Sequence, residues 1–271
     1  MGQHQQRLPR RMITHLGRAA RRAGIVTGAV AMVLLAACAT APRVPPQRSS
    51  LAHWTPSPNY NARKAQIIVL HHTSIGNAAE ALHVLRTRNS EGQVSAHYLV
   101  EADGRIDQLV DDGDRAWHAG ASHWAGISDL NSSSIGIEID NDGESPFTEP
   151  QIQALVRLLA DLTSRLGIPR EAVVGHGDIA PGRKNDPSVK FPWATLARYG
   201  FGLWPDATLI PAPPGFDSLA AMRLVGYDVS NPRSAIIAFH RHYRAMETDT
   251  LDNTDAAILY SLQRKLMAPR Q

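Results

Sequence analysis

The apolar residues between about residue 66 and residue 205 follow two different spacings. Residues 67–70 are a continuous run of Ile, Val and Leu, which is typical of a strand buried on both faces. Residues 135–140 alternate strictly, so three isoleucines share one face and Glu138 lies on the other. Residues 152–166 instead place their apolar side chains along one helical stripe. Strands mixed with helices over this length predict an α/β domain whose sheet is covered by helices.

The ends of the long helix are marked by characteristic residue types. Thr148 is the expected N-cap, and Gln151, three positions later, is expected to close a capping box by bonding back to the cap residue. Gly167 follows the apolar stripe and is the expected C-cap. The sequence therefore predicts a helix that begins after Thr148 and ends before Gly167.

A change in composition divides this domain from the rest of the chain. Residues 205–215 contain four prolines and indicate a linker, which we assign to residues 206–215. Three helical patterns follow, at about 216–224, 232–245 and 254–267. Because a segment of about 55 residues builds only a small core by itself, we predict a C-terminal three-helix module, residues 216–271, packed against the first domain.

The N-terminal segment has a different character. Residues 1–50 contain eight Arg and no acidic residue, and an uncharged segment from Ala23 to Cys38 follows the first six of these arginines. A positive region, a short apolar core and small residues at its end predict a secretory signal peptide, residues 1–37. The uncharged segment is shorter than the ~20 residues of a membrane-spanning helix. An uncleaved membrane anchor is the alternative.

Cys38 is the only cysteine, and it ends this apolar segment in the sequence Leu-Ala-Ala-Cys. That sequence resembles the lipobox of bacterial lipoproteins, in which the cysteine becomes the lipidated first residue. A buried cysteine that acts as a small hydrophobic residue is the alternative. We predict lipidation at Cys38, which attaches the mature chain to a membrane. Ala39 after the cysteine favours the outer membrane, with the protein facing the periplasm.

The segment after the lipidation site is expected to be extended. Residues 38–60 contain five prolines and little apolar periodicity, so we predict a tether there. Residues 61–205 are then the α/β domain.

Charge and cysteine content exclude several classes of function. The chain has 28 basic and 25 acidic residues, but six arginines lie in the predicted signal peptide, so the mature chain has 22 against 25 and a formal charge of −3. Nucleic-acid binding therefore has no compositional support. A single cysteine excludes an internal disulfide framework and any zinc finger that needs two or four cysteines.

Histidines at strand ends are the candidates for chemistry. His71 and His72 follow the 67–70 strand, His176 follows a short predicted strand, and Asp186 comes ten positions after His176. Two histidines and one carboxylate leave a zinc ion an open position, as in catalytic sites. Unconnected histidines and a loop aspartate are the alternative. Adjacent strand residues point to opposite faces, so His71 and His72 cannot easily bind one ion, and the spacing does not choose between them.

Several motifs, in this order, resemble a known family, the zinc-dependent N-acetylmuramoyl-L-alanine amidases, which include AmpD, the peptidoglycan recognition proteins and phage amidase lysozymes. The matching segments are Val69–Thr73, Ser95–Val100, Ala116–Gly120, Ser134–Glu138, Val174–Pro181, Arg183–Pro187 and Phe191–Trp193. Residues 216–271 are similar, more weakly, to a peptidoglycan-binding module of lipoprotein members. The resemblance covers about residues 54–206 and implies a mixed central β-sheet flanked by helices and one zinc ion per chain.

The resemblance also implies roles for single residues. His71, His176 and Asp186 match the zinc ligands, and only the resemblance makes this choice of the first histidine. Glu138 matches the catalytic acid and base, and Lys184 matches a basic position beside the zinc. The alternatives are an exposed strand glutamate and a solvated loop lysine.

The function implied by the resemblance is hydrolysis of the amide between N-acetylmuramic acid and L-alanine in peptidoglycan or muropeptides, during cell-wall turnover, by a monomer. His97 and His118 are assigned to substrate binding, and a hydrogen-bonded structural role is the alternative. Because the implied chemistry lies between His71 and Asp186, we predict that the C-terminal module is not required for cleavage. Two other functions are possible: a non-catalytic peptidoglycan-binding lipoprotein and a structural lipoprotein. Members that only bind usually lack a zinc ligand, whereas all three positions are filled here.

Overall fold

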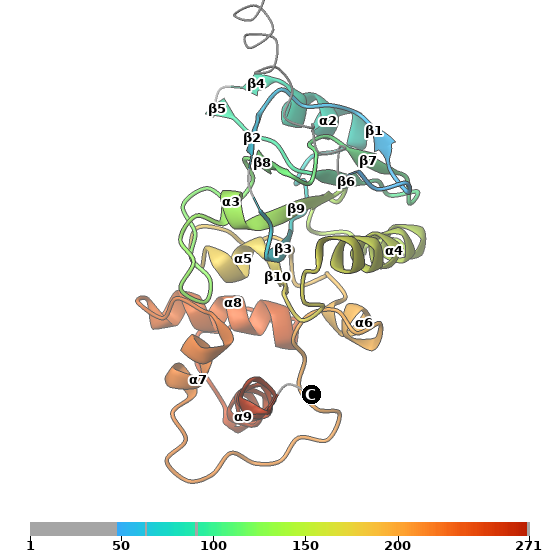
Figure 1. Ribbon diagram of the computed structural model, residues 1–271. Helices are drawn as coiled ribbons and strands as arrows, with labels where there is room; N and C mark the ends of the chain where they lie inside the picture. Colours follow the sequence, from blue (N-terminus) through green and yellow to red (C-terminus); the bar gives the residue numbers. More distant parts are fainter. Residues whose placement is uncertain (1–47, 63, 90–91, 270–271) are drawn as a thin grey trace, which may run out of the picture. The chain divides into compact units, whose positions relative to one another are not determined.

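A six-stranded sheet with the strand order β1-β7-β6-β9-β3-β10 lies at the centre of the described chain (Figure 1). The structure is a computed structural model that describes residues 48–62, 64–89 and 92–269, so the predicted signal peptide and Cys38 lie outside the described residues. Neighbouring strands are parallel except β6 and β7, which are antiparallel. The mixed sheet predicted from the sequence is confirmed. Its strands are β1 (His53–Trp54), β3 (Ile67–Leu70), β6 (Tyr98–Val100), β7 (Ile106–Gln108), β9 (Ser134–Ile139) and β10 (Val173–Gly175).

Two short antiparallel pairs and eight helices complete the described fold. The pairs are β2 (Tyr60–Ala62) with β8 (Asp114–Ala116) and β4 (Arg88–Asn89) with β5 (Gly92–Gln93). The helices are α2 (Ala78–Arg86), α3 (Leu130–Ser133), α4 (Glu149–Leu166), α5 (His176–Ile179), α6 (Trp193–Arg198), α7 (Ser218–Val225), α8 (Pro232–Arg244) and α9 (Asn253–Met267). None of the described helices combines the length and the apolar character that a membrane span requires.

The two faces of the sheet are covered by different parts of the chain. On one face, side chains such as Leu70 and Ile137 pack against the apolar stripe of α4. On the other face, Val69 belongs to one hydrophobic cluster with Met222 of α7 and Phe239 of α8. The described residues belong to one compact unit, and the C-terminal module covers the side of the sheet opposite to α4.

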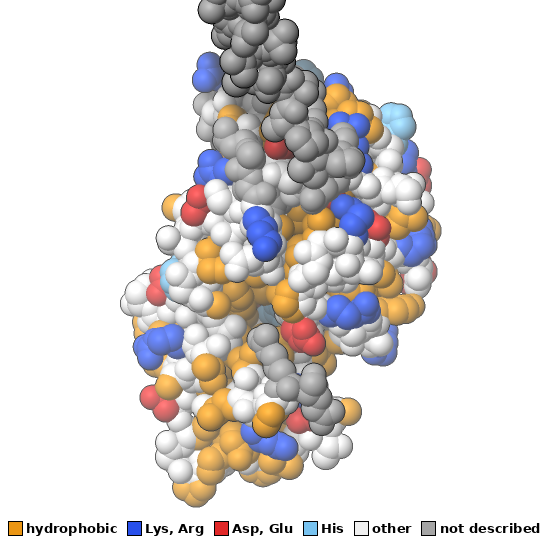
Figure 2. All heavy atoms as spheres, in the orientation of Figure 1, with side chains coloured by type: hydrophobic (Ala, Val, Ile, Leu, Met, Phe, Trp, Pro, Cys, Tyr) orange, Lys and Arg blue, Asp and Glu red, His pale blue; other side chains and the backbone are white. Residues whose placement is uncertain are grey.

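The C-terminal module also keeps apolar side chains at its surface. Hydrophobic side chains gather on the part of the molecule formed by α7, α9 and the loop that precedes α7 (Figures 1 and 2). Leu224, Leu266 and Met267 are exposed. The apolar residues of these helices therefore serve both the shared core and the outer surface.

The tether predicted for residues 38–60 is too long at its C-terminal end. His53 and Trp54 form β1, which pairs in parallel with β7 at the edge of the sheet. Ser57 is buried, and its backbone N–H donates to Leu109 O at 2.6 Å. An edge strand tolerates neighbouring prolines, because one side of it needs no ladder partner. The folded domain therefore begins before residue 53.

The predicted ends of α4 are confirmed, but the predicted capping box is wrong. The Thr148 hydroxyl accepts from the backbone N–H of Gln151, and Gly167 ends the helix at a φ of 67°. The Gln151 side chain does not return to the cap residue; it is buried and donates to Val100 O at 3.2 Å and to Asp140 O at 2.9 Å. This amide therefore joins the start of α4 to the ends of β6 and β9.

Replacing Gln151 with Ala should destabilise the fold by about 2 kcal/mol, because a buried carbonyl and a partly buried one lose a hydrogen-bond donor. Gln153→Ala is the matched control, since that amide bonds only exposed partners, and its cost should stay below about 0.5 kcal/mol. Urea unfolding of both variants measures the difference. An equal loss of stability in both variants would contradict the role of Gln151 in joining α4 to β6 and β9.

Candidate metal and catalytic site

Three site residues lie at the carboxyl ends of three neighbouring parallel strands: two directly follow a strand, and Glu138 is the second-last residue of β9. Leu70 of β3 pairs in register with Ile137 of β9 and with Gly175 of β10. The next positions along these strands are His71, Glu138 and His176. The backbone N–H of His71 donates to Ile137 O at 2.9 Å, which continues the ladder beyond β3. Because paired residues of parallel strands point to the same face, the register brings side chains that are far apart in sequence to one edge.

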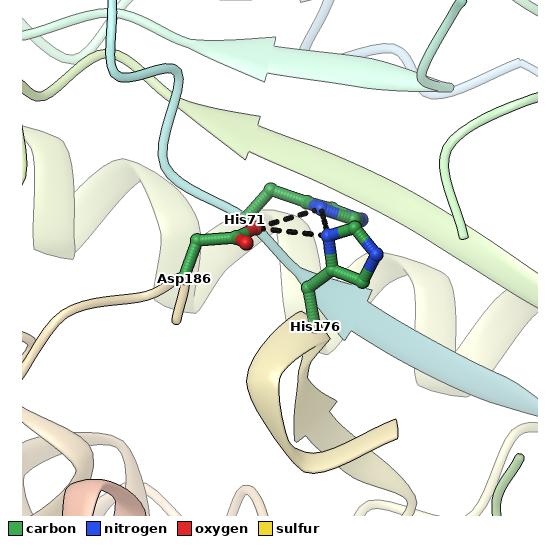
Figure 3. A group of neighbouring side chains, drawn as sticks. All are labelled: His71, His176 and Asp186. Atoms are coloured by element: carbon green, nitrogen blue, oxygen red, sulfur yellow. Dashed lines mark hydrogen bonds and ion pairs between the residues drawn. The ribbon is translucent and has the colours of Figure 1, made fainter. Parts of the chain in front are cut away.

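His71, His176 and Asp186 form a buried cluster (Figure 3). Nδ1 of His71 lies 2.9 Å from Nδ1 of His176 and 3.0 Å from Oδ2 of Asp186. Oδ2 of Asp186 lies 3.1 Å from Nδ1 of His176. The structure thus brings together all three residues that the resemblance assigns to a metal.

A chain of hydrogen bonds sets the proton position on His71. The Ser134 hydroxyl donates to Leu130 O, so its oxygen accepts from Nε2 of His118 at 3.2 Å. A neutral imidazole carries one N–H, so Nδ1 of His118 accepts from Nε2 of His71 at 3.0 Å. Nδ1 of His71 then carries no proton and presents its lone pair to the cluster.

The same reasoning applies to His176. Its Nε2 lies 3.2 Å from Ala119 O, which can only accept, and 3.4 Å from the Arg183 guanidinium, which can only donate. The shorter contact favours the N–H on Nε2, and in a neutral ring Nδ1 then carries no proton. Burial, followed by the charge that His176 carries when it is protonated, lowers the pKa of His71 to about 4, which keeps the His71 ring neutral near pH 7. Two bare nitrogens and a carboxylate oxygen therefore face one another. Such a set of acceptors can hold a cation between them.

Glu138 is half-buried beside this cluster. Among the described residues its Oε2 atom is buried and has no hydrogen-bond partner. Burial, followed by the negative charge of Asp186, raises the pKa of Glu138 to about 8, against the opposing charge of Lys184. The Lys184 side chain is exposed, and its charge also acts on His71. Both residues therefore lie within electrostatic range of the cluster.

His72 lies outside the cluster. It is buried, and its Nδ1 accepts from the backbone N–H of Ser188 at 3.2 Å. The alternation of side chains along the strand explains why two adjacent histidines have different surroundings. His72 holds the loop that follows Asp186.

His97 and His118 have different surroundings. His97 is fully buried; its Nδ1 accepts from the N–H of Gly136 at 2.9 Å and its Nε2 lies 3.0 Å from Asp114 O. His118 bonds His71, and its ring lies so close to Gly136 that a Cβ there would be 2.4 Å from its Cγ. These contacts favour the structural alternative for both, while substrate binding stays a prediction.

The sequence analysis missed several residues that support the site. Ser134 orients His118, and Oδ1 of Asn131 accepts from the backbone N–H groups of His118 and Ala119 at 2.9 Å and 2.8 Å. Asp178 lies within the matched motif around His176 but was given no role. Ser134 and His118 are 16 positions apart, so no local pattern indicates their contact.

Two histidines that follow strands of a mixed sheet, a loop carboxylate beside them and a neighbouring glutamate form a set of residues typical of metal-dependent hydrolases. Comparison with known proteins narrows this class. The profile of a family described as N-acetylmuramoyl-L-alanine amidase matches residues 61–189. The N-acetylmuramoyl-L-alanine amidase AmiD of Escherichia coli (strain K12) is 39% identical over 214 residues, which cover 67% of this chain and 75% of AmiD.

Solved structures agree with the sequence match. The complex of E. coli AmiD with anhydro-N-acetylmuramic acid-L-Ala-D-γ-Glu-L-Lys has a TM-score of 0.66 at 36% identity, covering 81% of this chain and 93% of that chain. AmpDh3 of Pseudomonas aeruginosa in complex with an anhydromuramic pentapeptide has a TM-score of 0.67 at 36% identity, covering 82% and 99%. The chain belongs to the N-acetylmuramoyl-L-alanine amidase family and is an enzyme of that family.

The raised pKa of Glu138 predicts how the stability of the metal-free protein depends on pH. The unfolded chain releases this proton near pH 4.5, whereas the folded chain holds it to about pH 8, so stability falls as pH rises through this window. Glu138→Gln removes this loss of stability, because the amide does not ionise. From pH 5 to pH 8.5 the free energy of unfolding of the variant should rise by about 2 kcal/mol relative to the parent. This is less than the full pKa shift of Glu138 would give, because the side chain is partly exposed.

Urea unfolding in the presence of a chelator at several pH values measures this difference. Glu144→Gln, an exposed glutamate, is the control and should show no such trend. A constant difference between Glu138→Gln and the parent across this range would show that Glu138 is ionised in the folded metal-free protein.

Proposed function

We propose that this chain uses one bound zinc ion to hydrolyse the amide between N-acetylmuramic acid and L-alanine in muropeptides, as part of cell-wall turnover. The observation that carries the proposal is the meeting of two unprotonated Nδ1 atoms and the Asp186 carboxylate beside Glu138. The substrate class is supported by the relatives, since AmiD and AmpDh3 were solved with anhydromuramyl peptides. The matched segments contain every residue of the proposed reaction.

The donor set fits zinc. Neutral imidazole nitrogens and a carboxylate oxygen are zinc ligands, and three protein ligands leave a position open for chemistry. Separations of 2.9–3.1 Å between the three atoms are close to the roughly 3.3 Å between tetrahedral ligands with bonds of about 2.0–2.1 Å. His118 and Ala119 O bind the outer nitrogens of the two rings, as outer partners of zinc ligands do. A zinc ion held there polarises the scissile carbonyl and makes water acidic enough to attack it near neutral pH.

The protein residues move the proton and stabilise charge. Glu138 accepts a proton from the attacking water as the new C–O bond forms at the carbonyl carbon. It then delivers that proton to the L-alanine nitrogen as the C–N bond breaks, which leaves a carboxyl group and a free amine. Burial raises the pKa of Glu138 to about 8 in the metal-free chain. The charge of a bound zinc ion would lower this pKa, which lets Glu138 accept a proton near neutral pH and still return it. Lys184 donates to the oxygen on which negative charge develops.

The location of the enzyme is part of the proposal. The arginine-rich leader and the Leu-Ala-Ala-Cys sequence at Cys38 support a lipid anchor in the outer membrane. An enzyme attached in this way faces the periplasm and meets both peptidoglycan and released muropeptides.

The zinc ligands are tested by substituting neighbouring histidines. His176→Ala should lose zinc, because the remaining site cannot replace one of three ligands. His72→Ala is the matched control and should keep close to one zinc ion per chain, since its contact is with Ser188. Elemental analysis of dialysed protein measures the stoichiometry. Equal loss in both variants would mean that the first ligand is misassigned.

Glu138→Gln should keep zinc and lose about 10³–10⁴-fold in kcat, because the amide cannot accept the proton. Lys184→Ala should lose less, since the bound metal still stabilises the developing charge. The measurement is kcat on an anhydromuramyl tripeptide, with zinc occupancy determined on the same samples. Near-parent turnover by a fully metallated Glu138→Gln protein would rule out Glu138 as the base.

A further inference from the structure

Asp178 receives hydrogen bonds from two parts of the chain. It lies on α5, two positions after His176, and is buried. Its Oδ2 accepts from the backbone N–H of Gly175 at 2.7 Å and from Nδ1 of His242 at 2.6 Å. Its Oδ1 accepts from the Tyr227 hydroxyl at 2.8 Å. One carboxylate thus joins the segment that carries a proposed metal ligand to two residues of the C-terminal module.

The same segment is packed against the module by its aromatic residues. The Trp193 ring stacks on His242 with a centroid distance of 3.8 Å and an interplanar angle of 13°. A Cβ at Gly175 would lie 3.2 Å from Cζ2 of Trp193 and 3.1 Å from Cδ of Pro187. Gly175 precedes His176, and Pro187 follows Asp186. The backbone beside each of these two proposed ligands therefore borders the same small cavity as the His242–Trp193 stack.

A second contact reaches the segment from α8. A Cβ at Gly177 would lie 2.9 Å from NH1 of Arg241, and Arg241 is buried. The backbone N–H of Gly177 donates to Asp186 O at 2.7 Å. The backbone hydrogen bond between Gly177, next to His176, and Asp186 therefore lies beside α8. Helices α5 and α8 are also neighbours in the fold (Figure 1).

We infer that the C-terminal module positions residues 175–186, which carry His176 and Asp186, through the hydrogen bonds of Tyr227 and His242 to Asp178. Both bonds converge on a carboxylate that also caps the first turn of α5 at Gly175. Their loss frees the turn that orients the His176 ring. Tyr227 and His242 are positioning residues, because they act on the site through Asp178 and touch none of the reacting atoms. The role in metal binding rests on the proposed function, whereas the role in ordering the segment does not.

Tyr227→Phe removes one donor and keeps the ring. In the full mature protein we expect the zinc dissociation constant to rise by about 10-fold, the lower end of the effect of losing an outer partner of a metal site. In the metal-free protein, backbone amides of residues 175–186 should exchange hydrogen faster than in the parent. Chelator competition measures the first quantity, and hydrogen–deuterium exchange measures the second.

Tyr243→Phe is the matched control. It removes the hydroxyl of a tyrosine on α8, which donates to Leu203 O at 3.2 Å and not to Asp178. Phe keeps the ring that stacks on His242. It should lower the Tm by a similar amount and leave both zinc affinity and exchange at residues 175–186 at parent values. If both tyrosine variants change zinc affinity and hydrogen exchange equally, the Tyr227 hydrogen bond contributes only to overall stability, and the inference is overturned.

Two variants at His242 separate the donor from the ring. His242→Phe keeps an aromatic ring over Trp193 and loses the donor, whereas His242→Asn loses the ring and keeps an N–H close to the position of Nδ1. If the hydrogen bond positions the segment, the Asn variant should bind zinc more like the parent than the Phe variant does. The opposite order would overturn the inference in favour of packing alone.

The parent protein separates the two hypotheses. Suppose that the parent binds zinc tightly and that the zinc dissociation constants of Tyr227→Phe and His242→Phe stay within twofold of the parent value. This result refutes the inference and leaves the proposed function intact. A parent that binds no zinc refutes the proposed function. In that case faster exchange of residues 175–186 in Tyr227→Phe, but not in Tyr243→Phe, still supports the positioning role, and unchanged exchange refutes it.

Discussion

The parallel register of β10, β3 and β9 is the constraint on which the site depends. Pairing of Leu70 with Ile137 and Gly175 places the next residue of each strand in one row. A slip of one position in β9 would exchange Glu138 for an isoleucine and turn the carboxylate towards α4. The apolar face of the sheet prevents this slip, because isoleucines of β9 fill the core under α4. Burial of the isoleucines on the face under α4 therefore fixes the position of Glu138 on the opposite face of the sheet.

The protonation of the cluster is set from outside it. The hydrogen bonds that run from Leu130 O through Ser134 and His118 leave Nδ1 of His71 without a proton. Ala119 O has the same effect on His176. Lone pairs of two rings and a carboxylate then face one another, an arrangement that a bound cation would stabilise. Two backbone carbonyls, a serine and His118 therefore orient the rings of the proposed ligands, and none of them belongs to the proposed ligand set.

The C-terminal module is more closely joined to the α/β domain than its linker suggested. It shares a hydrophobic cluster with the site face of the sheet, and its Tyr227 and His242 bond Asp178 beside His176. The expectation that cleavage does not require the module followed from the sequence positions of the chemical groups alone. These contacts give a physical reason to expect an effect of the module on the site, because a ligand-bearing turn keeps its geometry only while its own partners stay in place.

The sequence by itself determined the elements and the residue types of the site. The Ile-rich alternation of β9, the cap residues Thr148 and Gly167, and histidines at strand ends are local patterns, and motif order added the family and its proposed ligands. The tertiary structure alone decided which atoms meet. Gln151 spans β6 and β9 instead of closing a capping box, and residues 53–54 join the sheet edge, because partners distant in sequence compete with local ones. His118, Ser134 and Asp178 acquire their roles only through such long-range contacts, which no local spacing encodes.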